Sequence, residues 1–242
     1  KKALNAGKNV YVEKPLATNI NEAADLHALA KQKSLILMVG HILQYHSKFK
    51  KMKQCVKDDM IGKINYIYSN RLSFGKIRDE ENVLWSFGPH DVSMILSLID
   101  QEYIDVNAQM GNYIRSEVSD LCSLQIRFTN NVKAHINLSW LNPFKEHRLV
   151  AIGTKGMMVF EDSESDWDKK LQHYIYKVDK KDSSNNRVEE LKYIHCDYNE
   201  PMKEELGHFI DCITHNKTPL TGSEESLRVI QVISDAERSI LL

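Results

Sequence analysis

A continuous apolar run constrains the fold of this chain more than any other feature. Residues 35–40 read Leu-Ile-Leu-Met-Val-Gly and contain no polar side chain. Such a run is typical of a strand that is buried on both faces of a parallel sheet. A shorter run, Asn9 to Val12, leads to Pro15, which cannot donate to a strand ladder. A helical pattern, capped by Thr18 and extending to Lys33, joins the two runs, so the segment predicts a strand–helix–strand unit.

The first residues indicate that this unit belongs to a larger domain. Lys1 to Gly7 reads as the last turn of a helix that a glycine ends, and the first residue is not Met. One strand–helix–strand unit cannot cover both faces of its sheet. We therefore expect residues 1–45 to be the C-terminal remnant of a Rossmann-type dinucleotide-binding domain whose other strands precede residue 1. In agreement with this expectation, the sequence has no Gly-x-Gly-x-x-Gly motif for a pyrophosphate.

Residues 46–242 have a different pattern, in which strands outnumber helices. Asn130 and Asn131 separate two alternating segments and predict a hairpin turn. The predicted strands span 64–74, 121–128, 132–140, 149–153, 157–160, 171–178 and 188–195. The predicted helices span 47–58, 89–99, 202–214 and 224–241. This order indicates an α/β and α+β chain, in which the end of the Rossmann-type domain precedes a domain with a large, mostly antiparallel open sheet.

Charge and composition exclude several classes of function. Lys and Arg number 32 against 33 Asp and Glu, a formal net charge of −1, so no bulk attraction to nucleic acid is expected. The chain has neither an apolar run of about 18 residues nor a charged and apolar leader, so we expect a cytoplasmic protein without a membrane segment. The four cysteines form no CxxC pair, and no Cys/His cluster has metal-ligand spacing. We therefore expect no metal site.

A first candidate for chemistry is Glu13-Lys14-Pro15, which follows the first predicted strand. Ligands of open α/β sheets bind outside the carboxyl ends of the strands. A lysine in that place can reach a substrate hydroxyl, polarise its oxygen or lower the pKa of a neighbouring base. The alternative is a surface lysine beside a turn proline.

A second candidate is Trp85-Ser86-Phe87-Gly88-Pro89-His90-Asp91, which we expect to open the helix from Pro89 to Ile99. A histidine near a helix N-terminus tends to stay neutral, because the helix dipole disfavours the imidazolium. A neutral imidazole can accept a proton from a hydroxyl. The alternative is a histidine that only hydrogen-bonds the start of the helix.

A third candidate is the charged segment from Arg71 to Arg78, which begins in the last residues of the predicted 64–74 strand and precedes that helix. Arg71, Lys76 and Arg78 are cations of the kind that bind carboxylates and phosphates, with arginine able to form bidentate pairs. The alternative is a solvated loop whose charge is balanced by acidic neighbours. These neighbours are Asp79, Glu80 and Glu81.

Glu13-Lys14-Pro15 after a strand, followed about 75 residues later by Gly88-x-His90-Asp91, resembles the Gfo/Idh/MocA-type oxidoreductase family. The resemblance implies a Rossmann domain followed by an open-sheet domain, NAD as cofactor, and homo-oligomers that pack through the sheet. It places Lys14 and His90 beside the nicotinamide and the reacting hydroxyl. It also implies cofactor contacts from Glu13, Lys14, Pro15 and Gln44, and substrate contacts from Arg71, Lys76, Arg78, Trp85 and His90. Many family members have Asp where this chain has Ser86.

Further motifs are similar to one branch of that family, which oxidises the 3-hydroxyl of UDP-linked N-acetylaminouronic acids for surface polysaccharides. These motifs are 40–46, 66–72, 75–78, 85–91 and 139–146. The resemblance implies that His90 and Lys14 remove the hydroxyl proton while the hydride on C3 moves to NAD⁺. Which of the two is the base stays open, because coupled groups share their titration. Two alternatives also stay open: a related sugar or polyol dehydrogenase of the family, and a remnant without activity.

Overall fold

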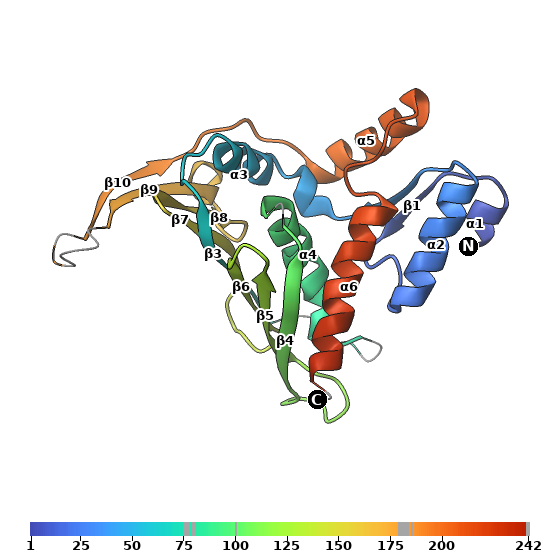
Figure 1. Ribbon diagram of the computed structural model, residues 1–242, viewed down its shortest axis with the longest axis horizontal. Helices are drawn as coiled ribbons and strands as arrows, with labels where there is room; N and C mark the ends of the chain where they lie inside the picture. The colour runs from blue at the N-terminus through green and yellow to red at the C-terminus, as the bar shows by residue number, and fades with distance from the viewer. Residues whose placement is uncertain (75–77, 79–80, 100, 179–183, 185, 241–242) are drawn as a thin grey trace.

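The protein consists of two sheets of unequal size on either side of a central pair of helices (Figure 1). The structure is a computed structural model. It describes residues 1–242 apart from 75–77, 79–80, 100, 179–183, 185 and 241–242. No helix in the described part is long and apolar enough to cross a membrane. All four cysteines have free thiols.

The predicted strand–helix–strand unit is confirmed. It follows a short helix, α1 (Lys2–Asn5), and consists of β1 (Val10–Glu13), α2 (Ile20–Gln32) and β2 (Leu37–Gly40). The two strands pair in parallel, from Val10 opposite Leu37 to Glu13 opposite Gly40, and every residue of β2 is buried. The predicted cap at Thr18 is wrong. The N-cap of α2 is Asn19, whose side chain accepts a hydrogen bond from the Asn21 amide at 2.8 Å.

The predicted large, mostly antiparallel sheet is also confirmed. Its strands are β3 (Ile64–Leu72), β4 (Tyr103–Gly111), β5 (Leu121–Phe128), β6 (Lys133–Ser139), β7 (Glu146–Gly153), β8 (Gly156–Glu161), β9 (Leu171–Lys177) and β10 (Arg187–Tyr193). They lie in the order β10-β9-β8-β7-β3-β6-β5-β4. Each pair is antiparallel except β3 with β6. Strand β4 was not predicted, because its apolar residues alternate with Asp105, Asn107 and Gln109. Asp and Asn are depleted in strands, and Gln does not favour a strand.

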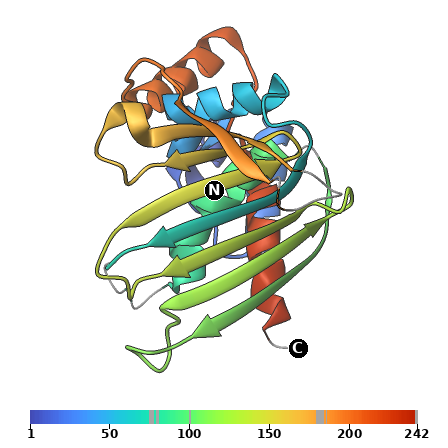
Figure 2. The same cartoon turned by 90° about the vertical axis from the view of Figure 1, so that its left-hand side faces the viewer.

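Four further α-helices complete the described fold: α3 (Ser47–Lys57), α4 (Val83–Leu98), α5 (Pro201–His215) and α6 (Ser223–Ser239). Two 3₁₀ turns, η1 (Ile42–Tyr45) and η2 (Trp167–Lys170), lie between strands and helices. Helices α4 and α6 cover one face of the large sheet, and buried side chains of β6, such as Ile136, join their core. Figure 2 shows the opposite face, which no described helix covers.

Helix α4 begins six residues earlier than predicted, at Val83 rather than Pro89. The side chain of Asn82 caps it by accepting a hydrogen bond from the Trp85 amide at 3.1 Å. Proline favours the first turn of a helix, which is why Pro89 predicted a start, but here Pro89 lies inside α4. A Cβ at Gly88 would lie 2.9 Å from Cδ1 of Ile233, so glycine lets α6 pack closely against this helix.

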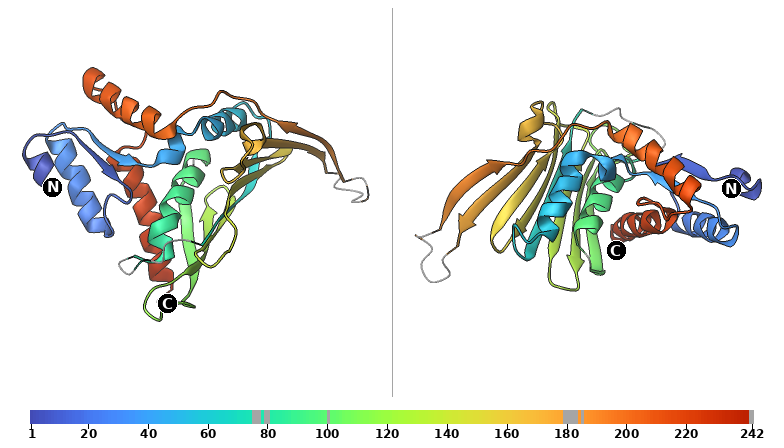
Figure 3. Two further views of the ribbon diagram at one scale, coloured as in Figure 1. Left: turned by 180° about the vertical axis from the view of Figure 1, so that it is seen from behind. Right: turned by 90° about the horizontal axis from the view of Figure 1, so that it is seen from above.

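The C-terminal segment closes the edge of the small sheet. The amide of Val39 donates to the carbonyl of Thr221 at 2.8 Å, and Met38 forms an antiparallel bridge with Gly222. Helix α2 packs against α6, so elements from both ends of the sequence lie side by side (Figure 3). The arrangement joins the carboxyl ends of β1 and β2 to the helices of the larger domain, and the candidate active site lies at this junction.

Candidate active site

Lys14 reaches helix α4 from the loop that follows β1. Its Nζ donates a hydrogen bond to the carbonyl oxygen of Ser86 at 2.5 Å. Ser86 precedes His90 by four residues, one helical turn or about 6 Å along the axis, so the two lie on one face of the helix. The structure therefore brings Lys14 and His90, which are distant in sequence, to one place at the carboxyl end of β1.

His90 is the eighth residue of α4, so the expectation that it lies at a helix N-terminus is wrong. Burial, rather than the helix dipole, is the first cause that holds the pKa of His90 well below its ordinary value; the cationic Arg71 and Lys14 add to it. Within the described part of the chain, Nδ1 of His90 is buried and has no hydrogen-bond partner. A neutral imidazole with a free ring nitrogen suits a proton acceptor.

Lys14 is also shifted toward its neutral form. Burial lowers the pKa of Lys14, and the cations Arg78 and Arg71 lower it further, whereas Glu81 and Glu13 oppose the shift. Arg78 is exposed and forms an ion pair with Glu81, NH1 to Oε1, at 2.5 Å. The structure thus places the charge of Arg78 near Lys14. Lys76, a third predicted cation, lies outside the described residues.

We expected Arg71 to lie in the charged loop, but it lies near the end of β3. It is buried, and its Nε donates to Oδ2 of Asp91 at 2.5 Å. NH1 of Arg71 lies 3.2 Å from Nδ1 of His147, and the hydroxyl of Ser69 donates to the same Asp91. The alternation of β3 turns Arg71 inward, where only a paired charge is tolerated. Arg71 therefore acts on Lys14 and His90 through its charge.

The polar groups of Trp85 and Gln44 do not contact Lys14 or His90, because each is hydrogen-bonded to other residues. The Trp85 indole is 5% exposed and donates to Oε1 of Glu237 at 3.2 Å. The Gln44 side chain is 2% exposed; its Nε2 donates to the hydroxyl of Ser93 at 2.9 Å, and its Oε1 accepts from Lys53 at 2.8 Å. The predicted ligand contacts of Trp85 and Gln44 therefore rest on the sequence resemblance alone.

Three residues that the sequence analysis did not single out surround the cluster. His41 follows β2, is 2% exposed, and its Nε2 lies 3.6 Å from Oε2 of Glu225 on α6. His147 on β7 contacts Arg71, and burial lowers its pKa. His41 could have been found from its position, because it directly follows a buried parallel strand. Nothing in the sequence connects Glu225 or His147 to Lys14.

The residues present fit the nicotinamide end of a dinucleotide. Glu13, Lys14 and Pro15 lie at the carboxyl end of a parallel strand, where such ligands bind, with Glu13 exposed and Pro15 partly buried. The buried, unpartnered nitrogen of His90 provides a polar contact there. The chain offers no Gly-x-Gly-x-x-Gly turn for the pyrophosphate. In the described part of the chain, no group of three or more side chains could hold a metal ion.

Comparison with known families gives two consecutive matches. Residues 1–41 match the model described as "Oxidoreductase family, NAD-binding Rossmann fold", and residues 49–159 match "GFO/IDH/MocA C-terminal domain". The two matches follow the same order as the strand–helix–strand unit and the large sheet.

Curated relatives are similar over part of the chain. A 1-carboxy-3-chloro-3,4-dihydroxycyclohexa-1,5-diene dehydrogenase of Comamonas testosteroni is 26% identical over 57% of the chain and 37% of its own length. A UDP-N-acetylglucosamine 3-dehydrogenase of Acidithiobacillus ferrooxidans is 27% identical over 57% of the chain and 42% of its own length. Both alignments thus span less than half of the relative.

Solved structures share the fold over nearly the whole chain. The structure of the Acidithiobacillus ferrooxidans enzyme covers 99% of this chain and 73% of its own, with a TM-score of 0.83 and 19% identity. The WlbA dehydrogenase of Bordetella pertussis, in complex with NADH and UDP-GlcNAcA, covers 99% and 71%, with a TM-score of 0.77 and 17% identity. These likenesses confirm the predicted combination of a Rossmann-type domain and an open-sheet domain.

Proposed function

Because the chain belongs to the Gfo/Idh/MocA oxidoreductase family, and its residues 1–41 correspond to part of that family's NAD-binding fold, we propose that it is an NAD-dependent dehydrogenase of a nucleotide sugar. The proposed reaction is oxidation of the 3-hydroxyl of a UDP-N-acetylaminouronic acid to the 3-keto sugar. One observation carries the proposal: the Lys14 ammonium donates to the carbonyl of Ser86 on α4, one helical turn before His90, whose buried Nδ1 has no hydrogen-bond partner among the described residues.

The chemistry assigns separate tasks to the residues of this cluster. NAD⁺ supplies the hydride acceptor when it is bound. His90 and Lys14, both biased toward their neutral forms, are placed to take the proton of the hydroxyl. Arg71, held by Asp91, keeps positive charge beside them and stabilises an oxygen that is becoming an alkoxide.

The choice of a uronic acid rests on cations and on relatives. Arg78 is exposed, and its charge reaches Lys14, so it can bind a substrate carboxylate or phosphate. The relatives include an enzyme named for UDP-N-acetylglucosamine and a structure with UDP-GlcNAcA bound. We further propose that Lys76, Trp85 and Gln44 contribute ligand contacts, and that the product enters surface polysaccharide synthesis in the cytoplasm.

An NAD⁺ reduction assay of the natural full-length protein tests the proposal. The substrates are UDP-GlcNAcA, UDP-N-acetylglucosamine, glucose and myo-inositol, with Lys14→Met and His90→Asn as variants of the candidate site and exposed Lys8→Met as the matched control. We expect NADH with UDP-GlcNAcA, and a higher KM for it in Arg78→Ala. Reduction with glucose or inositol alone would assign a related polyol dehydrogenase instead. Absence of reduction with every substrate would favour a remnant without activity.

A further inference from the structure

A buried histidine, His41, lies between the candidate active site and a cavity beside the start of α6. His41 is 2% exposed, and among the described residues neither of its ring nitrogens has a hydrogen-bond partner. Buried ring nitrogens of this kind are almost always paired, so His41 requires an explanation. His41 directly follows Gly40, which is paired in parallel with Glu13, so His41 and Lys14 leave neighbouring strands at the same end of the small sheet. Glu225 and Lys14 are the charged groups that act on His41, and His41 in turn acts on His90.

Glu225 is held so that one oxygen remains available to His41. The hydroxyl of Ser93 donates to Oε1 of Glu225 at 2.7 Å, and Gln44 donates to Ser93. The other oxygen, Oε2, is buried, has no hydrogen-bond partner among the described residues, and lies 3.6 Å from Nε2 of His41. A shift of a few tenths of an ångström, or one bridging water, makes this contact a hydrogen bond. Lys53 adds a positive charge beside Glu225.

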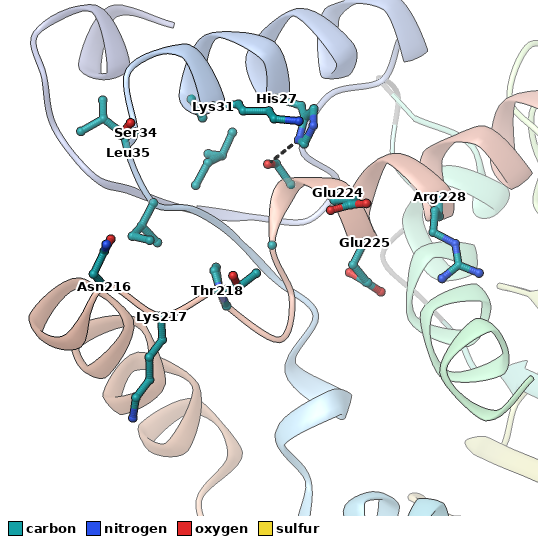
Figure 4. A pocket seen from close by; sticks show the side chains of 16 residues that line it. His27, Lys31, Ser34, Leu35, Asn216, Lys217, Thr218, Glu224, Glu225 and Arg228 are labelled. Carbon is teal, nitrogen blue, oxygen red and sulfur yellow. Dashed lines mark hydrogen bonds between the residues drawn. The ribbon is translucent and has the colours of Figure 1, made fainter. Parts of the chain in front are cut away.

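Glu225 also lines a cavity of about 510 Å³ that lies between α2, β2 and the start of α6. Figure 4 shows Glu224, Glu225 and Arg228 projecting from α6 at this cavity, with His27 and Lys31 on the α2 side. The side chain of Glu225 is 25% exposed, whereas that of His41 is 2% exposed. Glu225 therefore connects a buried imidazole with a solvent-accessible space.

We propose that His41 and Glu225 form the route by which the proton of the oxidised hydroxyl leaves the candidate active site for the solvent in this cavity. The proposal rests on the proposed dehydrogenase function. It assigns His41 and Glu225 a role as positioned proton carriers that do not touch the substrate.

The balance of the reaction requires such a route. Oxidation of the alcohol breaks its C–H and O–H bonds and forms the second C–O bond; bound NAD⁺ would accept the hydride and become NADH, and the proton is left on His90 or Lys14. That proton must reach solvent before the next turnover. His41 accepts it on one ring nitrogen and gives a proton from the other to the Glu225 carboxylate, which releases it to water. A turn of the ring restores the starting tautomer.

Kinetics of the full-length protein test the route, with Glu225→Gln and His41→Asn as the variants. Glu224→Gln is the matched control, because it removes the same charge from the same cavity but does not face His41. We expect kcat to fall by about tenfold or more in both variants, with KM for the sugar unchanged, as expected for loss of a proton-transfer step. The solvent deuterium isotope effect on kcat should grow, and added imidazole should restore part of the rate. Unchanged kcat and isotope effect, with Lys14→Met inactive, would overturn the proposal.

A second measurement decides the matter if the parent protein oxidises none of the sugars. The ring signals of His41 are followed by NMR against pH in isotope-labelled protein. We expect Glu225→Gln to lower the pKa of His41 and Lys14→Met to raise it, because the first removes a neighbouring anion and the second a neighbouring cation. Glu224→Gln should leave it unchanged. A His41 titration that responds to neither Glu225→Gln nor Lys14→Met would overturn the coupling that the route needs.

Discussion

Lys14 and His90 meet because a loop of the small sheet reaches over the second turn of α4. If both side chains take part in transfer of the same proton, they act as a unit, so the rate losses caused by the two single substitutions should not multiply in the double variant. We expect Lys14→Met and His90→Asn each to lower kcat by about 10²–10⁴-fold. The double variant should be little worse than the worse single variant in the NAD⁺ reduction assay. Fully multiplicative losses would argue for independent roles.

Arg71 and Asp91 form a buried pair whose disruption should be costly. Asp91→Asn leaves the Arg71 guanidinium buried without its carboxylate, which costs about 3–5 kcal/mol in the free energy of unfolding. Urea unfolding measures this loss. The matched control is Asp105→Asn, which breaks an arginine pair of similar geometry, 2.7 Å from Arg127, on the exposed surface. The control should change stability little, because water screens that pair. Equal losses in the two variants would contradict the assignment.

His46 should make the protein sensitive to mild acid. It caps α3 by accepting a hydrogen bond from the Lys48 amide on Nδ1, and burial lowers its pKa from 6.5 to about 4. As the pH falls, the unfolded chain therefore binds a proton on His46 at a higher pH than the folded protein does. The contribution of His46 is fully present above pH 6.5 and is lost progressively down to about pH 4, by at most about 3 kcal/mol.

His46→Asn tests this contribution, because asparagine can still cap the helix but does not titrate. Unfolding free energies of parent and variant are compared at about pH 7.5 and about pH 4.5. We expect the difference between parent and variant to shrink or reverse toward the lower pH. Taking the difference cancels other groups, including Glu205, whose pKa is raised to about 7 by burial and which therefore changes stability in the opposite direction. A constant difference would exclude the assigned role of His46.

At the scale of helices and strands, two glycines give a matched pair of substitutions, because a Cβ would meet open space at one and a backbone atom at the other. Gly207 lies inside α5, and a Cβ there would meet nothing within 4 Å, so Gly207→Ala should stabilise the protein by about 0.5–1 kcal/mol. A Cβ at Gly153, at the end of β7, would lie 2.1 Å from the carbonyl oxygen of Ile61. Because that atom belongs to the backbone, Gly153→Ala should destabilise the protein. Thermal unfolding of the two variants gives the signs, and equal signs would refute the argument.

The elements that the sequence predicts well are those with a strong period or a continuous apolar run. Strand β2 and the alternating β6 were predicted for this reason. The start of α4 was missed because Pro89 favours a helix start, whereas burial of Val83 and Leu84 extends the helix toward its N-terminus. Long-range packing of this kind leaves no local signal.

The candidate site divides in the same way. Lys14 and His90 were singled out because their two motifs together resemble one family, whereas each motif alone says little; their shared catalytic role stays a prediction. The inward turn of Arg71 could not be predicted, since it depends on Asp91 being placed opposite by another element. Glu225 was also beyond prediction, because α6 reaches His41 only through the packing of the whole chain.

At the scale of the whole molecule, the uncovered face of the large sheet predicts assembly. Figure 2 shows that no described helix lies over this face. Tyr66 and His135, which alternate with buried residues of β3 and β6, are hydrogen-bonded at 2.7 Å and partly buried. Sheet faces of this kind are usually covered in the working protein. We expect a homo-oligomer packed through this face.

Light scattering of the natural full-length protein at micromolar concentration measures the assembly. Exposed Asn137→Arg, which introduces a charge on the outward face of β6, should shift the mass toward a monomer. Exposed Lys8→Glu, on the small domain, is the control and should leave it unchanged. A parent protein that is already a monomer would disprove the expected assembly.

The bridge between β2 and the segment before α6 has a consequence for how the protein is made. Until Thr221 and Gly222 leave the ribosome, the amide of Val39 and the outer edge of β2 have no partner. Domains generally fold in the order in which they are synthesised, but here β2 depends on a segment that is synthesised much later. An unpaired strand edge invites association with other chains. The nascent chain therefore passes through a long interval in which this edge of β2 is exposed, and a chaperone that shields it would act during that interval.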